Sequence, residues 1–129
     1  MTRRVDVRLK ANGALLVRGA RWCSSFFCRL RGLMFRQRLT PGEALILVEA
    51  AESRTSASIH MLFVPFPIAA VWINSAGRVV DVVEAKPWRP FYAPRAPARY
   101  TLEAEPEILS RVSIGDEVVF EDSPAGVGR

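Results

Sequence analysis

Hydrophobic and polar positions alternate over short stretches of this chain, and turn-forming residues separate the stretches. Such alternation places every second side chain on one face of a strand, so it predicts half-buried β-strands. The first stretch, residues 5–9, precedes Asn12-Gly13, a pair that favours a hairpin, and residues 14–18 are expected to return as its second strand. Residues 44–48 are almost continuously apolar, which is typical of a short strand buried on both faces.

The rest of the chain continues this pattern between further turns and prolines. We expect one short helix after Ser24 or Ser25, whose hydroxyl groups can cap its first N–H groups, and one or two helical turns at residues 106–111. Residues 50–57 are expected to form a polar loop, and residues 87–97 an ordered, proline-rich loop whose aromatic side chains are buried. Further strands are expected at residues 59–64, 68–73, 78–84, 99–103 and 118–120.

These elements predict the class of the fold. The helices are too few and too short for repeating β-α-β units, and many short strands between turns are typical of a sandwich or a barrel. The chain has 129 residues, which suits one domain that needs no metal or disulfide to fold. We expect a mainly-β, jelly-roll-like sandwich or barrel as a single domain over residues 1–122, with one or two short helices and a flexible tail at residues 123–129.

Apolar runs and cysteines bear on the compartment. No run approaches the roughly 20 apolar residues of a membrane helix. Charged residues also interrupt the N-terminus before any signal-peptide core could form. We therefore expect a cytoplasmic protein with no membrane partner. Cys23 and Cys28 are interpreted as reduced thiols, because side chains five positions apart on one short helix point to different sides.

Basic side chains are concentrated in the first third of the chain. Residues 1–39 contain ten bases and one acid, whereas residues 40–129 contain eight bases and twelve acids. Such asymmetry is compatible with nucleic-acid or other anionic partners. Mutual neutralisation of the two parts in the fold is the interpretation that we favour, since no nucleic-acid-binding motif accompanies the basic segment.

Four short motifs follow one another along the chain. They are Arg31-Gly32-Leu33-Met34-Phe35-Arg36, Ile59-His60-Met61 with Phe66-Pro67-Ile68 and Gly77-Arg78-Val79-Val80, Lys86-Pro87-Trp88-Arg89, and Leu102-Glu103 with Gly115-Asp116. Together they resemble DUF192, a small bacterial and archaeal family of unknown function, over about residues 20–120. The resemblance implies a mainly-β, jelly-roll-like fold and no particular reaction. The family usually has an acid where this chain has Ala69 and Ala70, so an active site that needs this acid would be incomplete here.

His60 is the first candidate for chemistry, because histidine is the commonest general acid or base in enzymes. In a strand over residues 59–64 it lies among apolar residues, where a structural role is the simpler interpretation. An enzyme that uses His60 as a general base, with Asp81, Glu84 or Glu103, is the alternative. Neither a nucleophile elbow nor a glycine-rich phosphate loop occurs in the sequence. A zinc site that joins His60 to the two cysteines lacks an evident fourth ligand, so we expect no metal and no cofactor.

A second candidate site depends on the proline-rich loop. If that loop folds over the strand ends, basic and aromatic side chains form a cationic rim, in which arginine contacts carboxylate or phosphate and Trp88 stacks. The alternative is that Trp88 closes the end of the sandwich. We expect a non-catalytic binding module for a small anionic or glycan-like ligand or for a protein partner, with nucleic-acid binding through residues 1–39 as another hypothesis. The predicted rim consists of Arg31, Arg36, His60, Lys86, Trp88 and Arg89.

Overall fold

Seven strands and two short helices make up the computed structural model of the protein, which describes residues 3–124. The strands are β1 (Arg4–Leu9), β2 (Leu15–Cys23), β3 (Leu45–Ser53), β4 (Ile68–Ile73), β5 (Val79–Ala85), β6 (Ala98–Ala104) and β7 (Val118–Asp122). The helices are α1 (Phe26–Arg31) and the 3-10 helix η1 (Pro106–Ser110). The described strands form one sheet in the order β5-β4-β6-β3-β2-β1-β7. Every neighbouring pair is antiparallel except β2 and β3.

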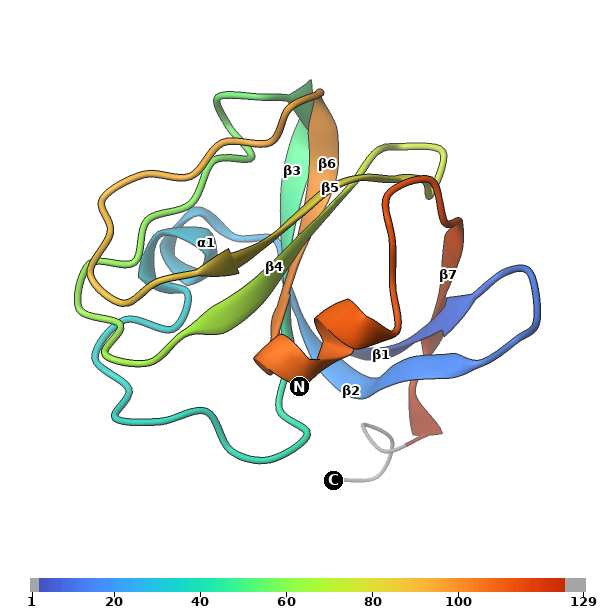
Figure 1. Ribbon diagram of the computed structural model, residues 1–129, viewed down its shortest axis with the longest axis horizontal. Coiled ribbons are helices and arrows are strands. Elements are labelled where there is room, and N and C mark those ends of the chain that lie inside the picture. The colour runs from blue at the N-terminus through green and yellow to red at the C-terminus, as the bar shows by residue number, and fades with distance from the viewer. Residues whose placement is uncertain (1–2, 125–129) are drawn as a thin grey trace.

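The sheet curls into a half-barrel, so the mainly-β expectation is confirmed (Figure 1). The first hairpin forms as predicted, because Gly13 adopts a φ of +70° and the Asn12 side chain accepts the N–H of Ala14 at 2.9 Å. The two predicted helical segments are also found, at α1 and η1. The other strands, apart from one, lie within a few residues of their predicted positions.

The central strands separate two apolar clusters, since alternate side chains of a strand point to opposite faces. On β3, Ile46 and Val48 pack into the cluster inside the curl, with residues from β1, β2 and η1. Leu45 and Leu47 pack on the other face, against residues of the loops that follow α1 and β3. All four are buried, as the continuous apolar run predicts.

One predicted strand, residues 59–64, is wrong because the segment bonds to another loop and not to the sheet. Ile59 and Tyr92 exchange two backbone hydrogen bonds of 2.9 Å. Two residues later, the N–H of Met61 donates to the carbonyl of Arg89 at 2.7 Å. A short, mostly apolar segment looks the same in sequence whether it pairs with a strand or with a second loop.

Two predicted boundaries also differ from the structure. The polar loop expected at residues 50–57 begins later, because β3 continues to Ser53, which pairs with Ala98 of β6. At the other end, Ser123 is buried and its N–H donates to the carbonyl of Arg4 at 2.9 Å. Residues 125–129 of the predicted tail lie outside the described part of the chain.

The interpretation of the cysteines as reduced thiols is wrong, since Cys23 and Cys28 form a disulfide with their Cα atoms 5.5 Å apart. The two residues do not share a helix. Cys23 ends β2, whereas α1 begins at Phe26 after the Ser25 cap, so a sharp bend brings the two side chains together. The bridge fixes the start of α1 to the sheet. Because disulfides are typical of oxidising compartments, the cytoplasmic location loses this support and stays a prediction.

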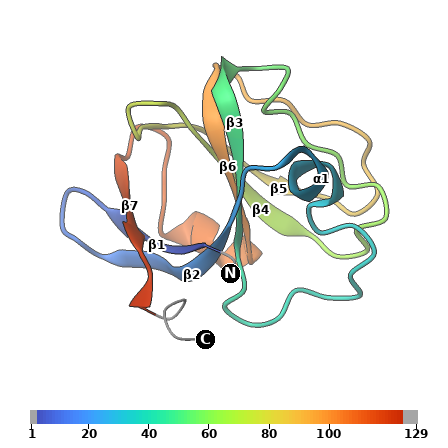
Figure 2. The ribbon, with the colours of Figure 1, turned by 180° about the vertical axis from the view of Figure 1, so that it is seen from behind.

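Three segments gather at one end of the molecule, which we call the loop end: residues 24–43, 54–67 and 84–97. They lie on the left of Figure 1 and on the right of Figure 2, away from the β1–β2 hairpin and β7. The expected burial of the aromatic residues in the proline-rich loop is wrong for Trp88 and Phe91, which are more than half exposed. The loop end nevertheless covers the second apolar cluster, and it contains the candidate site.

Candidate functional site

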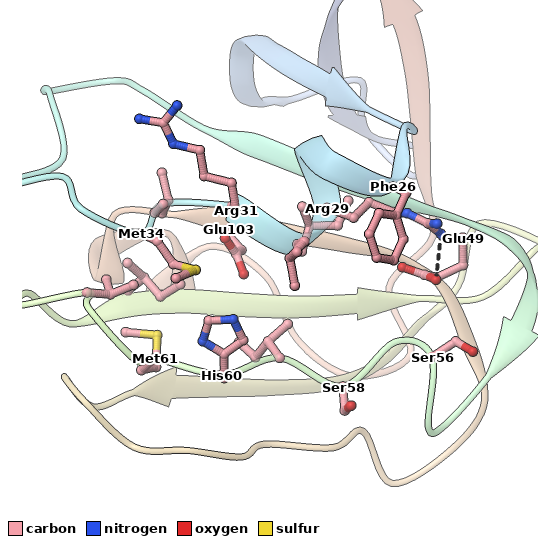
Figure 3. Close-up of a pocket in the computed structure, with 17 residues that line it drawn as sticks. Phe26, Arg29, Arg31, Met34, Glu49, Ser56, Ser58, His60, Met61 and Glu103 are labelled. Atoms are coloured by element: carbon pink, nitrogen blue, oxygen red, sulfur yellow. Dashed lines mark hydrogen bonds and ion pairs between the residues drawn. The ribbon is translucent and has the colours of Figure 1, made fainter.

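A pocket of about 330 Å³ lies between α1 and the segment around His60 (Figure 3). We call it the Glu103 pocket. Its apolar wall comes from α1, from the turn after it, from β3 and from the loop before β4, and includes Phe26, Leu33 and Met61. Its polar lining consists of Arg29, Arg31, Glu49, Ser56, Ser58, His60 and Glu103.

The alternation of β6 brings Glu103 into this pocket. Leu102 points into the curl of the sheet and is fully buried there, so its neighbour Glu103 must point to the opposite face, beneath α1. In register, Glu103 stands between Leu45 of β3 and Ala70 of β4, both of which are buried. A carboxyl group therefore lies in the middle of an apolar sheet face.

The carboxyl group of Glu103 has no hydrogen-bond or ion-pair partner among residues 3–124, although the residue is only 4% exposed. Burial raises the pKa of Glu103 to about 7, because the charged form is poorly solvated there. Gly32 covers this group closely, since a Cβ atom at that position would lie 3.8 Å from Oε1 of Glu103. A buried polar group without a protein partner is one that water or a ligand in the pocket must satisfy.

His60 faces Glu103 across the pocket in Figure 3. The N–H of Leu62 donates to Nδ1 of His60 at 3.2 Å. In the neutral ring the proton is then carried by Nε2, which is left to donate into the pocket. The structural role considered for His60 is thus met by one ring nitrogen, and the other remains available.

Arg29 and Glu49 close one side of the pocket as an ion pair, with Nη1 of Arg29 2.9 Å from Oε1 of Glu49. Burial raises the pKa of Glu49, although the guanidinium opposes this effect. The Nε atom of Arg29 is buried and has no hydrogen-bond partner among the described residues. This atom is too buried for a molecule in the pocket to reach, so the carboxyl group of Glu103 remains the main unpaired group there.

Of the predicted rim, only Arg31 and His60 line the Glu103 pocket. The guanidinium of Arg31 points away from His60 in Figure 3. Arg31 also lines a second hollow of about 560 Å³, which we call the arginine hollow, together with Arg21 and Arg36. Arg36 is already engaged, since its guanidinium donates to both carboxylate oxygens of Glu43 at 2.6 and 2.7 Å. This pairing lowers the pKa of Glu43 to about 2.

The other three rim residues lie in the proline-rich loop and do not line the pocket. The ring of Trp88 contacts that of Phe63, with centroids 5.2 Å apart, so it does not close the end of the sheet. The guanidinium of Arg89 lies 5.9 Å from the centroid of the Tyr92 ring. Lys86 makes a long ion pair of 3.8 Å with Glu84. The rim residues thus share the loop end without forming one cavity.

Sequence reasoning named Glu103 only as one of three acids that might assist His60, and it missed Arg29 and Glu49. The strand of Glu103 gives no signal for burial, because Thr101, which shares its face two residues earlier, is also polar. The apolar neighbours of Glu103 are Leu45 and Ala70 on the adjacent strands, which only the sheet order reveals. The Arg29–Glu49 pair joins a helix to a strand 20 residues away, and no local pattern indicates such a contact.

The charge asymmetry of the chain is partly resolved by the sheet order. Strand β7 lies beside β1, so acids near the C-terminus pair with bases near the N-terminus. The pairs are Arg3–Asp122 at 3.2 Å, Arg8–Glu121 at 3.0 Å and Lys10–Glu117 at 3.4 Å. These contacts favour the neutralisation that we expected, and nucleic-acid binding stays a prediction.

Neither metal ligands nor a membrane helix is found in the described part of the chain. Among residues 3–124, no three His, Cys, Asp or Glu side chains gather as a metal-binding group would require. Within the same residues, no helix has the length and apolar character needed to cross a bilayer.

Comparison with known proteins gives matches in sequence and in fold. The profile of DUF192, described as "Uncharacterized ACR, COG1430", matches residues 7–120. A UPF0127 protein of Thermococcus sibiricus is 36% identical over 116 residues, which cover 87% of this chain and 72% of that protein. A UPF0127 protein of Pyrococcus furiosus is 40% identical over 94 residues, covering 73% and 78% of the two chains.

Two crystal structures resemble the fold. One, from Sinorhizobium meliloti, carries the name "putative transcription regulator"; its TM-score is 0.79 at 21% identity, over 93% of this chain and 94% of that one. The other is a protein of unknown function from Novosphingobium aromaticivorans, with a TM-score of 0.77 at 21% identity, over 90% and 83% of the two chains. At this level of identity the likeness concerns the fold alone.

Proposed function

The chain belongs to the DUF192 family, which is uncharacterized, so its function has to be inferred from its own residues. We propose that the protein binds a small carboxylate with an apolar body in the Glu103 pocket. The observation that carries the proposal is the buried Glu103 carboxyl group, which has no partner among the described residues and faces the pocket. Such a group costs stability unless something in the cavity hydrogen-bonds to it. A ligand that does so recovers this cost on binding.

The polar lining favours an anionic head group. Glu103 in its neutral form and Nε2 of His60 are both hydrogen-bond donors. The carboxylate of Glu49 is already occupied by Arg29, so the pocket has donors to spare and few free acceptors. A ligand carboxylate, which only accepts hydrogen bonds, complements this set.

The size and the apolar wall of the pocket determine what the rest of the ligand should be. The pocket volume of about 330 Å³ lies at the lower end of the range for small-molecule sites, which are mostly apolar with a few convergent polar groups. Phe26, Leu33 and Met61 supply apolar contact opposite the polar groups. The anionic ligand expected at the cationic rim is thus proposed for this pocket, with Arg31 and His60 shared between the two sites.

The experiment uses hexanoate, with hexanol as a neutral probe of the same length, in ligand-observed NMR titrations at pH 6 and pH 8. Hexanoate is ionised at both pH values, but Glu103 is mostly neutral at the first and mostly ionised at the second. We expect hexanoate to bind about ten-fold more weakly at pH 8, because the proton on Glu103 must be present.

Two variants make the test specific. Glu103→Gln keeps a neutral donor, so it should bind hexanoate equally at both pH values, and Glu121→Gln on the far strand β7 should behave as the wild type. Equal affinity for hexanol and hexanoate would refute a carboxylate ligand. Unchanged pH dependence in Glu103→Gln would refute the role given to the Glu103 proton, and with it the observation that carries the proposal. Glycan-like ligands and protein partners would then become the better hypotheses.

Acid–base catalysis is a second candidate, and one observation favours it: Glu103 has a pKa of about 7 and faces His60 across one pocket. A group that titrates near the working pH is suited to proton transfer. Incubation with a panel of carboxylic esters and amides, monitored by NMR, would give turnover that both Glu103→Gln and His60→Gln abolish. Binding without turnover, in the wild type, would leave the first proposal standing alone.

A further inference from the structure

We propose that the loop end docks onto an anionic lipid bilayer, with its aromatic side chains in the interfacial layer and its arginines at the lipid phosphates. This inference does not depend on the Glu103 pocket. It rests on three features of the loop end: its exposed apolar residues, the backbone conformation of three of them, and its charge.

Large apolar side chains are exposed mainly at this end of the molecule. Ten such residues are exposed in the described chain, and only Ile114 and Val119 lie elsewhere. Phe27, the most exposed, is 78% accessible. An apolar patch of this kind on a globular protein marks a surface that contacts another apolar phase. The eight residues at the loop end are Phe26, Phe27, Leu30, Phe35, Leu62, Phe63, Trp88 and Phe91.

Three of these aromatics have a strained backbone. Phe35, Phe63 and Trp88 have φ values of +67°, +60° and +66°, and they are the only non-glycine residues with positive φ in the described chain. Bulky side chains rarely adopt this conformation. Their rings form one exposed group, in which the centroid of the Phe63 ring lies 5.0 Å from that of Phe35 and 5.2 Å from that of Trp88. Strain held at exposed residues indicates a role outside the core.

The net charge of the protein lies at the same end. Residues 24–43, 54–67 and 84–97 contain eight bases and two acids, a net charge of +6, whereas the rest of the chain sums to −1. Arg31, Arg38 and Arg89 have no acidic partner among the described residues. Basic groups beside exposed aromatic rings complement an anionic bilayer, because the bases contact the lipid phosphates and the rings enter the interfacial layer below them.

The arginine hollow offers a place for a lipid phosphate. Arg21, Arg31 and Arg36 line it, and Phe27 stands at its edge. The Nε atom of Arg21 is buried without a hydrogen-bond partner among the described residues. This atom is too buried for a ligand to reach, so a lipid phosphate in the hollow would contact the terminal guanidinium nitrogens while Phe27 contacts the acyl-chain boundary.

A bilayer fits this surface better than a protein partner does. The exposed rings stand on α1 and on three separate loops. The aromatic group of Phe35, Phe63 and Trp88 is 45–66% exposed and lines neither the Glu103 pocket nor the arginine hollow. Protruding rings can enter a fluid interface without a matching cavity. The sequence predicted no membrane partner because no segment can span a bilayer, but a surface that lies on the lipid needs no such segment.

The experiment measures co-sedimentation of the protein with phosphatidylcholine vesicles that contain either no phosphatidylglycerol or 30% of it. An aromatic variant carries Phe35→Asn, Phe63→Asn and Trp88→Asn, because asparagine tolerates positive φ and the fold is retained. Its control carries Ile114→Asn and Val119→Asn, which remove the two exposed apolar residues outside the loop end. Circular dichroism and the melting temperature verify that both variants fold.

A charge variant carries Arg31→Gln, Arg38→Gln and Arg89→Gln, and its control carries Arg3→Gln, Arg4→Gln and Arg18→Gln outside the loop end. One base near an anionic surface changes partitioning by about five-fold, so the charge variant should bind anionic vesicles about a hundred-fold more weakly. The aromatic variant should lose binding by at least ten-fold, and both controls should bind as the wild type does.

Several results would overturn the proposal. They are equal binding to neutral and anionic vesicles, equal losses in the variants and their controls, and no binding by the folded wild type. Self-association that the aromatic variant abolishes, seen by light scattering without vesicle binding, would assign the surface to a second copy of the chain. Glu103→Gln should leave vesicle binding unchanged, so this test fails or succeeds independently of the pocket.

Discussion

Replacing Glu103 with glutamine should make the protein more stable in alkaline solution. Burial raises the pKa of Glu103 from 4.5 to about 7. In the unfolded chain the carboxyl group titrates near its ordinary value, so between these two pKa values the folded protein holds a proton that the unfolded chain has released. Stability therefore falls as the pH rises from about 4.5 through 7, and it levels off above that range.

The size of the effect follows from the same pKa values. Each unit of difference between the folded and the unfolded pKa corresponds to about 1.4 kcal/mol, so ionised Glu103 costs the folded state about 3 kcal/mol at pH 9. Glutamine has the same shape and does not ionise, so Glu103→Gln escapes this cost. A gain of this size is a large fraction of the stability of an ordinary domain.

Urea unfolding of the wild type and Glu103→Gln, followed by circular dichroism at pH 5 and pH 9, measures the difference. We expect the two free energies of unfolding to differ by about 2.5 kcal/mol more at pH 9 than at pH 5, with unchanged urea dependence. Glu121→Gln, at an exposed position of β7, is the matched control. If the difference between wild type and Glu103→Gln is the same at both pH values, the carboxyl group is solvated or paired, and the argument for the pocket fails.

Three further predictions concern stability. Because the pKa of Glu43 is lowered, its pairing with Arg36 stabilises the fold above pH 4.5, and this stabilisation is lost as the pH falls toward 2. In urea titrations, Arg36→Gln should lower the free energy of unfolding by about 1 kcal/mol at pH 7, since the pair is partly exposed, and by less at pH 3. Replacing Cys23 and Cys28 by serine should lower the free energy of unfolding by about 2 kcal/mol, because the closed loop is short; an unchanged melting temperature would contradict this. Phe63→Asn should change stability by no more than about 1 kcal/mol, as relief of strain offsets the lost ring contacts; a loss of about 3 kcal/mol would show that the ring is structural.

The fold was predictable where periodicity and turn chemistry agree. Asn12-Gly13 lies between two alternating stretches, and the hairpin forms there. The continuous apolar run at residues 44–48 coincides with the doubly buried start of β3. In both cases the local pattern and the tertiary environment require the same side-chain directions, so the sequence alone suffices.

The site was harder to predict, because it depends on contacts between distant segments. His60 was singled out, but its segment pairs with the loop around Tyr92 and not with the sheet. The disulfide was missed because it depends on the residue at which α1 begins, and Ser25 places that start beyond Cys23. Trp88 was expected to be buried because it is large and apolar, but its ring lies half exposed against that of Phe63.

The helix α1 is six residues long and none of its side chains is buried. A helix of this length does not persist in water on its own, since nucleation costs more than so few turns return. Its shape is therefore imposed from outside, by the Ser25 cap, the cystine bridge and the Arg29–Glu49 pair. The helix that covers Glu103 should therefore exchange its amide hydrogens faster than the buried strands do, and loss of any of these three contacts should speed that exchange further.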